Sequence, residues 1–168
     1  MDFLSGLPIT QKQHDAIWVV VCRFSKMALF IPCKKTTTAA QTTELYLRYV
    51  WLNFGLPTSI ISDRDSRFLS TFWKTLWALL GCNLKYSTAF HPQNNGQTEV
   101  VNRVLVHALR THFGRSKQWD SYLHILQHNY NRATHSSTGY SPFEVCLGFQ
   151  PDLLLTWTPQ RTMHQQQE

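Results

Sequence analysis

The chain has 168 residues, of which 43% are apolar and 13% aromatic, and its 16 Lys and Arg outnumber 10 Asp and Glu to give a formal charge of +6. This length and apolar content fit one folded domain with a substantial core and exclude an intrinsically disordered chain. The four cysteines form no C-x-x-C pair, and no apolar run has the roughly 20 residues that a membrane span needs. The positive charge favours a polyanionic partner without identifying it.

The first third of the sequence predicts three strands and a helix. Asp2 to Leu7 is short and apolar, Ala16 to Val21 is a β-branched run, and Phe24 to Pro32 gives a third strand that closes an antiparallel set. From Thr38 to Asn53 the apolar residues recur at helical spacing, and Gly55 follows as a stop signal. A helix that crosses over to a parallel strand is the expected continuation.

That strand is Ser59 to Ser62, and it delivers Asp63 at its C-terminal end, where open α/β sheets place their ligand sites. A helix from Ser70 to Leu80, with Ser70 as N-cap, and a last strand from Leu84 to Ser87 follow. Later helices are expected over 97–113 and 118–130, and a short one at 142, which Ser141 opens with a capping box.

Two acidic motifs carry the chemistry. Asp63 stands in Ser62-Asp63-Arg64-Asp65, and Glu99 ends a polar stretch that begins at His91, with residues 64–98, 35 in all, between the two carboxylates. A single Asp in a loop is more often a solvated turn residue, so Asp63 alone carries little weight. The fixed spacing and the flanking residues make the combination specific. Asp65 is expected to cap the turn that follows Asp63.

These motifs resemble the catalytic core of retroviral and retrotransposon integrases, most closely those of the Ty3/Gypsy type, and the resemblance runs from Met1 to about Gln150. It implies an RNase H-like α/β fold with a five-stranded mixed sheet flanked by helices, whose first strand is truncated at the N-terminus. Residues 1–150 would form the core domain and 151–168 a loosely packed or disordered tail. The matching segments are Met1-Asp2-Phe3, Ile17-Trp18-Val19-Val20-Val21, Ser62-Asp63-Arg64-Asp65, His91-Pro92-Gln93 and Gly96-Gln97-Thr98-Glu99.

By this resemblance the chain acts in DNA integration as a polynucleotidyl transferase that trims DNA 3′ ends and joins them to a target. Asp2, Asp63 and Glu99 would be the catalytic triad and hold two Mg²⁺ (or Mn²⁺) ions, since hard cations prefer carboxylate oxygens. Because Asp2 is the second residue, we expect the first strand to fray and weaken this ligand.

The resemblance also implies partners. These are DNA, both element ends and target, and a second copy of the chain in a homodimer or higher assembly, with no membrane contact and with the nucleus as the expected location. The polar loop before Glu99 would contact the DNA end, and the helix behind Glu99 would add further contacts. The residues expected to bind DNA are Phe90, His91, Asn94, Asn95, Gln97, Asn102 and Arg103.

Two alternatives stay open. One is a transposon-derived module that binds DNA or assembles without catalysis, which the departures Cys22 and Val100 from the family pattern favour. DNA binding that does not depend on Asp63 or metal would distinguish it. The other is an unrelated RNase H-like nuclease, which shares the carboxylates but does not account for the motif from His91 to Glu99.

Overall fold

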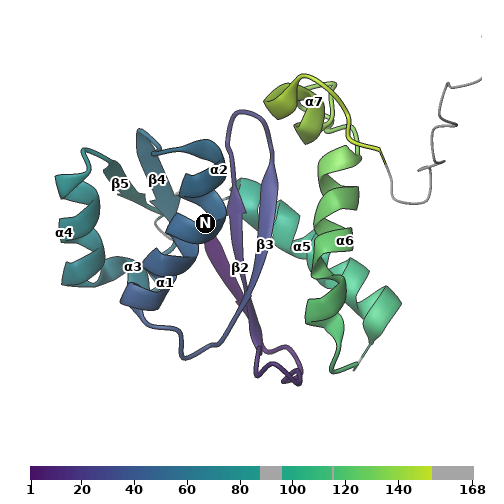
Figure 1. Cartoon of the computed structure of the whole chain (residues 1–168), viewed down its shortest axis with the longest axis horizontal. Coiled ribbons are helices and arrows are strands. Elements are labelled where there is room, and N and C mark those ends of the chain that lie inside the picture. The colour runs from purple at the N-terminus through teal and green to yellow at the C-terminus, as the bar shows by residue number, and fades with distance from the viewer. Residues whose placement is uncertain (88–95, 115, 153–168) are drawn as a thin grey trace, which may run out of the picture.

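The computed structural model describes residues 1–87, 96–114 and 116–152, and it places the strands in a central layer with helices on both sides (Figure 1). Strands β1 (Asp2–Ser5), β2 (Ala16–Val21) and β3 (Ala28–Cys33) form an antiparallel sheet in the order β1-β2-β3. Strands β4 (Ser59–Ser62) and β5 (Asn83–Tyr86) form a parallel pair. This mixed α/β arrangement confirms the expected fold class.

The helices pack as two groups, one on each side of the strands (Figure 1). The first group follows β3 and β4, and the second follows β5. Their bounds are α1 (Ala39–Tyr46), continued by a π-helical turn η1 (Leu47–Trp51) into α2 (Leu52–Phe54), α3 (Ser66–Leu69), α4 (Thr71–Leu79), α5 (Gly96–Phe113), α6 (Trp119–Arg132) and α7 (Pro142–Leu147). Among the helices of the described part of the chain, none is both long and apolar enough to cross a membrane.

The start of β1 is held in the sheet, contrary to the expected fraying. Asp2 lies opposite Val19 in the register with β2, and Met1 is only 7% exposed. The backbone nitrogen of Met1 also donates a 2.7 Å hydrogen bond to the carbonyl of Ile61 in β4. This bond aligns β1 with β4 and joins the antiparallel strands to the parallel pair.

The strand after β2 begins later than the sequence predicts. We expected it from Phe24, but it begins at Ala28, because the chain first turns back between Cys22 and Met27. The Cys22 N–H donates to the Met27 carbonyl at 2.8 Å, and Lys26 adopts a positive φ of 64° within the turn. Other local predictions are confirmed: Ser70 caps α4, and Ser141 forms a capping box with Glu144 at α7.

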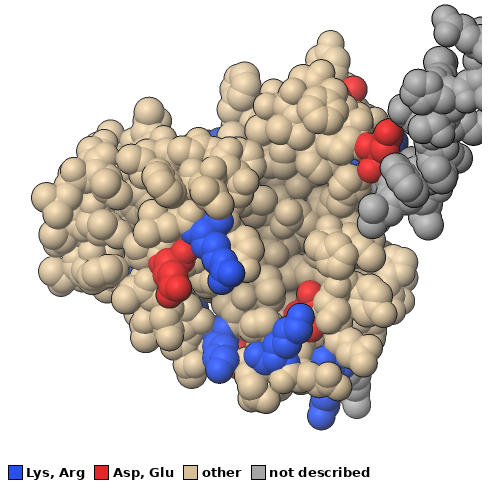
Figure 2. All heavy atoms as spheres, viewed as in Figure 1, with Lys and Arg blue, Asp and Glu red and all other residues tan. Residues whose placement is uncertain are grey.

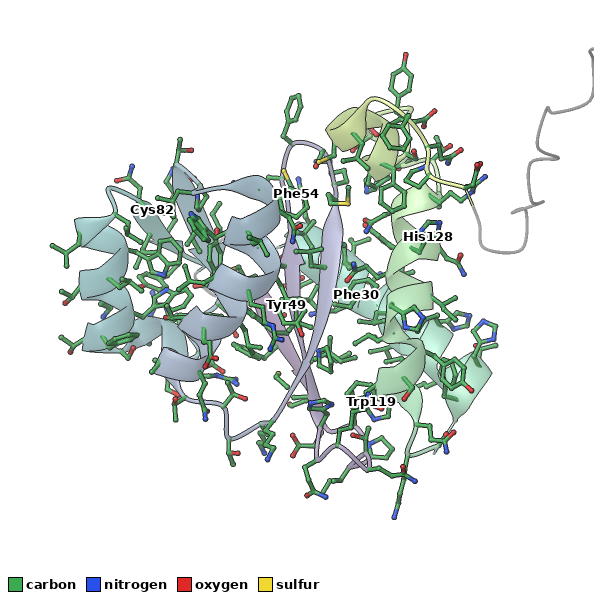
Figure 3. All side chains as sticks on the ribbon, in the orientation of Figure 1. Phe30, Tyr49, Phe54, Cys82, Trp119 and His128 are labelled. Atoms are coloured by element: carbon green, nitrogen blue, oxygen red, sulfur yellow. The ribbon has the colours of Figure 1, made fainter. Side chains whose placement is uncertain are left out.

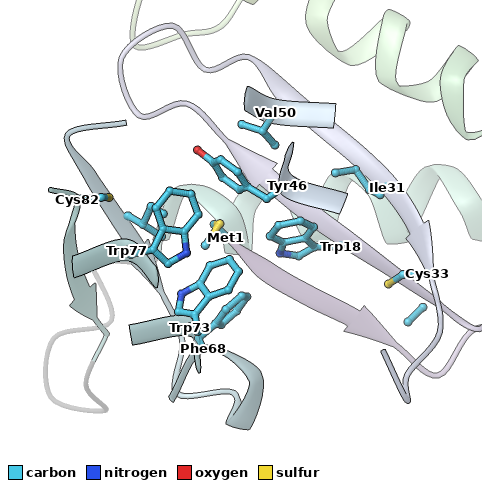
Figure 4. Close-up of a cluster of buried hydrophobic side chains, with 12 residues drawn as sticks. Met1, Trp18, Ile31, Cys33, Tyr46, Val50, Phe68, Trp73, Trp77 and Cys82 are labelled. Atoms are coloured by element: carbon cyan, nitrogen blue, oxygen red, sulfur yellow. The ribbon is translucent and has the colours of Figure 1, made fainter. Parts of the chain in front are cut away.

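Two hydrophobic clusters fill the two sides of the sheet, because successive residues of β2 point to opposite faces. On the side of α1, α3 and α4, Trp18 packs with an aromatic group in which the Met1 side chain also lies (Figure 4). On the other side, Ile17 and Val19 pack against α5 and α6. The aromatic group comprises Tyr46, Phe68, Trp73 and Trp77.

Helix α6 covers the outer edge of β3. The side-chain amide of Asn131 accepts from the Ala28 N–H and donates to the Ala28 carbonyl, both at 2.8 Å, and Gln127 accepts from the Phe30 N–H at 2.7 Å. Phe30 and Trp119 lie between the sheet and α6 (Figure 3). Side-chain amides thus satisfy backbone groups that a further strand would otherwise satisfy.

The chain's positive charge is not gathered on the face seen in Figure 2. Most of that face is uncharged, and the basic side chains in its lower part are interspersed with acidic ones. We therefore do not expect a polyanionic partner to bind this face.

Candidate active site

Asp2 and Asp63 are brought together at the ends of neighbouring strands. Asp2 begins β1, Asp63 follows β4, and the bond from Met1 to Ile61 holds these two strand segments side by side. Burial of the Asp63 carboxyl and the negative charge of Asp2 raise the pKa of Asp63. The Asp65 N–H donates a 3.3 Å hydrogen bond to Oδ1 of Asp63, and this bond partly opposes the shift. A buried carboxylate whose ionisation a neighbouring negative charge disfavours suits a site for a cation.

Asn102 fixes the orientation of the Asp2 carboxylate. Its Nδ2 donates a 2.8 Å hydrogen bond to Oδ2 of Asp2, while Oδ1 of Asp2 accepts a 2.7 Å bond from the Phe3 N–H. The Asn102 Oδ1 atom is buried and has no hydrogen-bond partner among the described residues. We expected Asn102 to contact DNA, but the structure places its amide against a carboxylate 100 residues earlier in the chain.

Glu99 does not join this pair in the structure. It lies in the first turn of α5 with an exposed side chain, three residues before Asn102 and therefore on neighbouring positions of the same helix face. Within residues 1–87, 96–114 and 116–152, no three His, Cys, Asp or Glu side chains lie close enough together to hold a metal ion. The expected triad is thus represented by two adjacent carboxylates and a third on the helix that also carries Asn102.

Several solved integrase structures share this fold. The catalytic core of BIV integrase superposes with a TM-score of 0.65 at 20% identity over 88% of this chain and 92% of that one. An HTLV-2 integrase core in complex with magnesium, in trimeric form, gives 0.59 at 18% identity over 84% and 99%. A simian T-cell lymphotropic virus intasome in complex with PP2A regulatory subunit B56 gamma gives 0.67 at 17% identity over 89% and 60%.

Sequence likeness extends to mobile elements. The chain is 38% identical over 157 residues, 91% of its length, to the Transposon Tf2-3 and Tf2-4 polyproteins of Schizosaccharomyces pombe. The chain belongs with the integrase catalytic cores of Ty3/Gypsy-type retrotransposons. It spans 12% of the length of each of these polyproteins. No protein-family model matches it.

The second aspartate of the Asp-Arg-Asp motif has a separate structural role in this integrase core. Asp65 caps α3, as expected, and its two carboxylate oxygens pair with the Arg67 guanidinium at 2.7 and 2.6 Å. These hydrogen bonds and the positive charge of Arg67 lower the pKa of Asp65. Because Asp65 is already neutralised, Asp63 is the carboxylate of this motif that is left to bind a cation.

Besides Asn102, whose amide contacts Asp2, six other residues were expected to bind DNA. Arg103 is exposed on α5, next to Asn102. Gln97 is half-buried, and its amide oxygen is buried without a hydrogen-bond partner in the described part of the integrase core. The remaining four residues lie outside the described residues, and their DNA contacts stay predictions: Phe90, His91, Asn94 and Asn95.

Sequence reasoning missed the contacts that shape the site. Neither the bond from Asn102 to Asp2 nor the pair of Arg67 with Asp65 was anticipated. A spacing of two residues between Asp65 and Arg67 after a strand was a readable signal for a local ion pair. The contact of Asn102 had no such signal, because it depends on how α5 packs against β1.

Proposed function

We propose that this integrase core trims DNA 3′ ends and transfers them to a target DNA, with Asp2, Asp63 and Glu99 as ligands of two Mg²⁺ or Mn²⁺ ions. The observation that carries the proposal is the adjacent pair of Asp2 and Asp63, held together by the bond from Met1 to Ile61, in which burial and the charge of Asp2 raise the pKa of Asp63. The retrotransposon relatives and the integrase-core fold support the same reaction class.

The donor set fits a hard divalent cation. Carboxylate oxygens are the ligands that Mg²⁺ prefers, and an ion between Asp2 and Asp63 would offset both the burial of the Asp63 charge and the repulsion from Asp2, which together raise the pKa of Asp63. Glu99 would complete the set from α5. When bound, such ions activate the attacking oxygen and stabilise the leaving oxygen of a phosphodiester. The HTLV-2 integrase core that was solved with magnesium agrees with this choice of metal.

Neighbouring residues would orient the carboxylates that bind the metal ions. Asn102 holds one oxygen of Asp2 while the Phe3 N–H holds the other, so the carboxylate loses little freedom on binding a cation. The Asp65 N–H orients Asp63 in the same way. Arg67 neutralises Asp65 and so keeps a third negative charge from competing for the cation.

We also propose DNA as the partner, both element ends and target, and the nucleus as the location. The net charge of +6 and the exposed Arg103, which follows Asn102 on α5, support binding to a phosphate backbone. A homodimer or higher assembly is proposed from the trimeric and dimeric forms of the HTLV-2 integrase core and from the viral intasome.

A joining assay tests the proposal. The chain is incubated with a labelled oligonucleotide that carries the element end, with Mg²⁺ or Mn²⁺, and products longer and shorter than the substrate are measured. We expect both products from the parent and a loss of at least 100-fold for Asp63→Asn and for Glu99→Gln, since each removes a proposed metal ligand. Glu44→Gln, which changes an exposed carboxylate on α1, is the matched control. Equal activity in all four proteins contradicts the assignment.

A second candidate is a DNA-binding or assembly module without catalysis. The exposed position of Glu99, apart from the Asp2 and Asp63 pair, favours it. Salt-dependent binding of the oligonucleotide that is unchanged by Asp63→Asn and by a chelator, together with no products in the joining assay, would support this module.

A further inference from the structure

The four free cysteines divide into a buried pair and an exposed pair. Cys33 and Cys82 belong to the hydrophobic cluster that holds the aromatic group, and burial raises the pKa of both thiols, to about 12 for Cys33 (Figure 4). Cys22 and Cys146 are exposed. Oxidants react with thiolates rather than thiols, so the buried pair is inert and the exposed pair is open to reaction. The proposed integration reaction uses neither exposed thiol.

The turn that carries Cys22 lies against the end of α6. Cys22 follows β2 directly, and its N–H donates to the Met27 carbonyl at 2.8 Å, which closes the turn between β2 and β3. The next residue, Ala28, is bonded through its N–H and its carbonyl to Asn131 in the last turn of α6. The base of the turn is therefore fixed to this end of α6.

Helix α7 packs against the same end of α6. The ring centre of Phe143 on α7 lies 5.1 Å from that of His128, one helical turn before Asn131. Cys146 follows Phe143 by three residues and so lies on a neighbouring position of the same helix face. The β2–β3 turn and α7 are consequently neighbours (Figure 1), and the charge of Cys22 reaches Cys146.

The two exposed thiols differ in reactivity. Partial burial raises the pKa of Cys22, but hydrogen bonds from the hydroxyl and N–H of Ser25, together with the positive charge of Lys26, outweigh it and lower the pKa overall. The Lys26 N–H donates to the Cys22 carbonyl at 2.9 Å, so the turn keeps these groups in place. Burial and the charge of Cys22 raise the pKa of Cys146. An accessible thiolate beside a second thiol is the arrangement of an attacking and a resolving cysteine.

We propose that Cys22 and Cys146 form an oxidation site, which hydrogen peroxide converts to a disulfide between the β2–β3 turn and α7. The Cys22 thiolate attacks one peroxide oxygen, the O–O bond breaks, and hydroxide leaves as Cys22 becomes a sulfenic acid. The Cys146 sulfur then attacks the sulfur of Cys22, the S–O bond breaks, and the hydroxyl leaves with the Cys146 proton as water. The hydroxide takes up the proton that Cys22 had released. Two thiols thus lose two electrons, and one peroxide becomes two waters.

Peptide mapping of the 168-residue chain tests the proposal. The reduced protein is treated with stoichiometric hydrogen peroxide, unfolded, alkylated and digested with trypsin, which releases residues 13–23 and 133–161 as separate peptides. We expect these two peptides to be joined by a disulfide, and Cys33 and Cys82 to be alkylated. The same experiment on a mixture of isotopically heavy and light protein should give no heavy–light pairs, because the bridge forms within one chain.

Two serine variants separate the roles of the two thiols. In Cys146→Ser the sulfenic acid at Cys22 has no resolving partner, so we expect dimedone to label it after peroxide treatment. In Cys22→Ser we expect labelling to fall by roughly tenfold or more, because the pKa of Cys146 is raised. Both side chains are exposed, so both variants should keep the Tm of the reduced parent.

Thermal unfolding gives an independent measurement. The bridge would close a loop of about 120 residues, and a cross-link over so long a loop restricts the unfolded chain. We expect peroxide to raise the Tm of the parent by several degrees and a dithiol to reverse the rise, with no rise in Cys22→Ser. Alkylated Cys22 and Cys146 after peroxide treatment, bridges only in heavy–light pairs, or equal dimedone labelling of the two variants would overturn the proposal.

Discussion

The guanidinium carbon of Arg67 lies 3.3 Å from the centre of the Phe3 ring, so an arginine on α3 stacks on the first strand. The same guanidinium pairs with Asp65 through two hydrogen bonds. One cation thereby links β1, where Asp2 lies, to the turn that carries Asp63. The position of the two carboxylates depends on this link as well as on the sheet.

Replacement of Arg67 tests this link. In Arg67→Gln the stack on Phe3 is lost and Asp65 keeps a half-buried charge without its partner, so we expect a loss of about 2 kcal/mol in the free energy of unfolding. Chemical denaturation at neutral pH measures this change. Arg64→Gln is the matched control, because Arg64 is exposed in the same turn. Similar losses in both variants would mean that charge alone, and not the stacked position, matters.

The pKa shift of Asp63 predicts an unusual gain of stability in a variant. Because the folded-state pKa of Asp63 is raised, its ionised form opposes folding, and this cost grows as pH rises through the folded pKa. Asp63→Asn should therefore raise the Tm at neutral pH without metal, and the gain should vanish in acid. Asp65→Asn should do the reverse, since a lowered pKa means that ionised Asp65 stabilises the fold above its usual pKa. Thermal unfolding across pH distinguishes the two carboxylates.

Asn102 should matter for metal binding more than for folding alone. Asn102→Ala removes the donor to Asp2, and we expect a loss of about 1 kcal/mol in stability together with a smaller Mn²⁺-induced rise in Tm. The Mn²⁺ titration is compared with that of Arg103→Ala, whose side chain is exposed on the same helix. If Asn102→Ala keeps the full metal response of the parent, the amide does not orient a metal ligand.

Arg103 should contribute to DNA affinity through charge. For Arg103→Ala we expect weaker binding of all DNA sequences alike and a salt dependence of log K reduced by about one unit of slope. Fluorescence anisotropy over a range of salt concentrations measures this slope. Lys74→Ala, on the exposed side of α4, is the control and should leave the slope unchanged. An equal change in both variants would place the DNA elsewhere on the surface.

The parts of this structure that the sequence predicts well depend on short-range signals. The strand from Ala16 to Val21 and the caps at Ser70 and Ser141 are determined by residues within a few positions, and they are confirmed. Helix α3 was not predicted, since its four residues are too few to show a period. The third strand was extended into the turn at Lys26, whose left-handed backbone gives no compositional signal.

In the candidate site, too, the features that short-range patterns determine were predicted and those that depend on long-range packing were not. Spacing and flanking residues singled out Asp63 and Glu99, and with Asp63 assigned as the ligand, Asp65 was expected to cap the turn. The contact between Asn102 and Asp2 and the electrostatic coupling of Asp2 to Asp63 depend on packing of segments far apart in the chain, which no local pattern encodes. The expected fraying of β1 was wrong for the same reason, since Ile61, which accepts the hydrogen bond from Met1, lies 60 residues away.

The amides of Asn131 and Gln127 on α6 occupy the hydrogen-bonding positions of a neighbouring strand along β3. An open strand edge is a template for self-association, and here two side chains block it. A shortened protein that ends before α6 would retain the strands but expose this edge. It should therefore precipitate or form fibrils, even if its core still folds. The open edge of β3 is thus shielded by two amide side chains more than 90 residues beyond the strand.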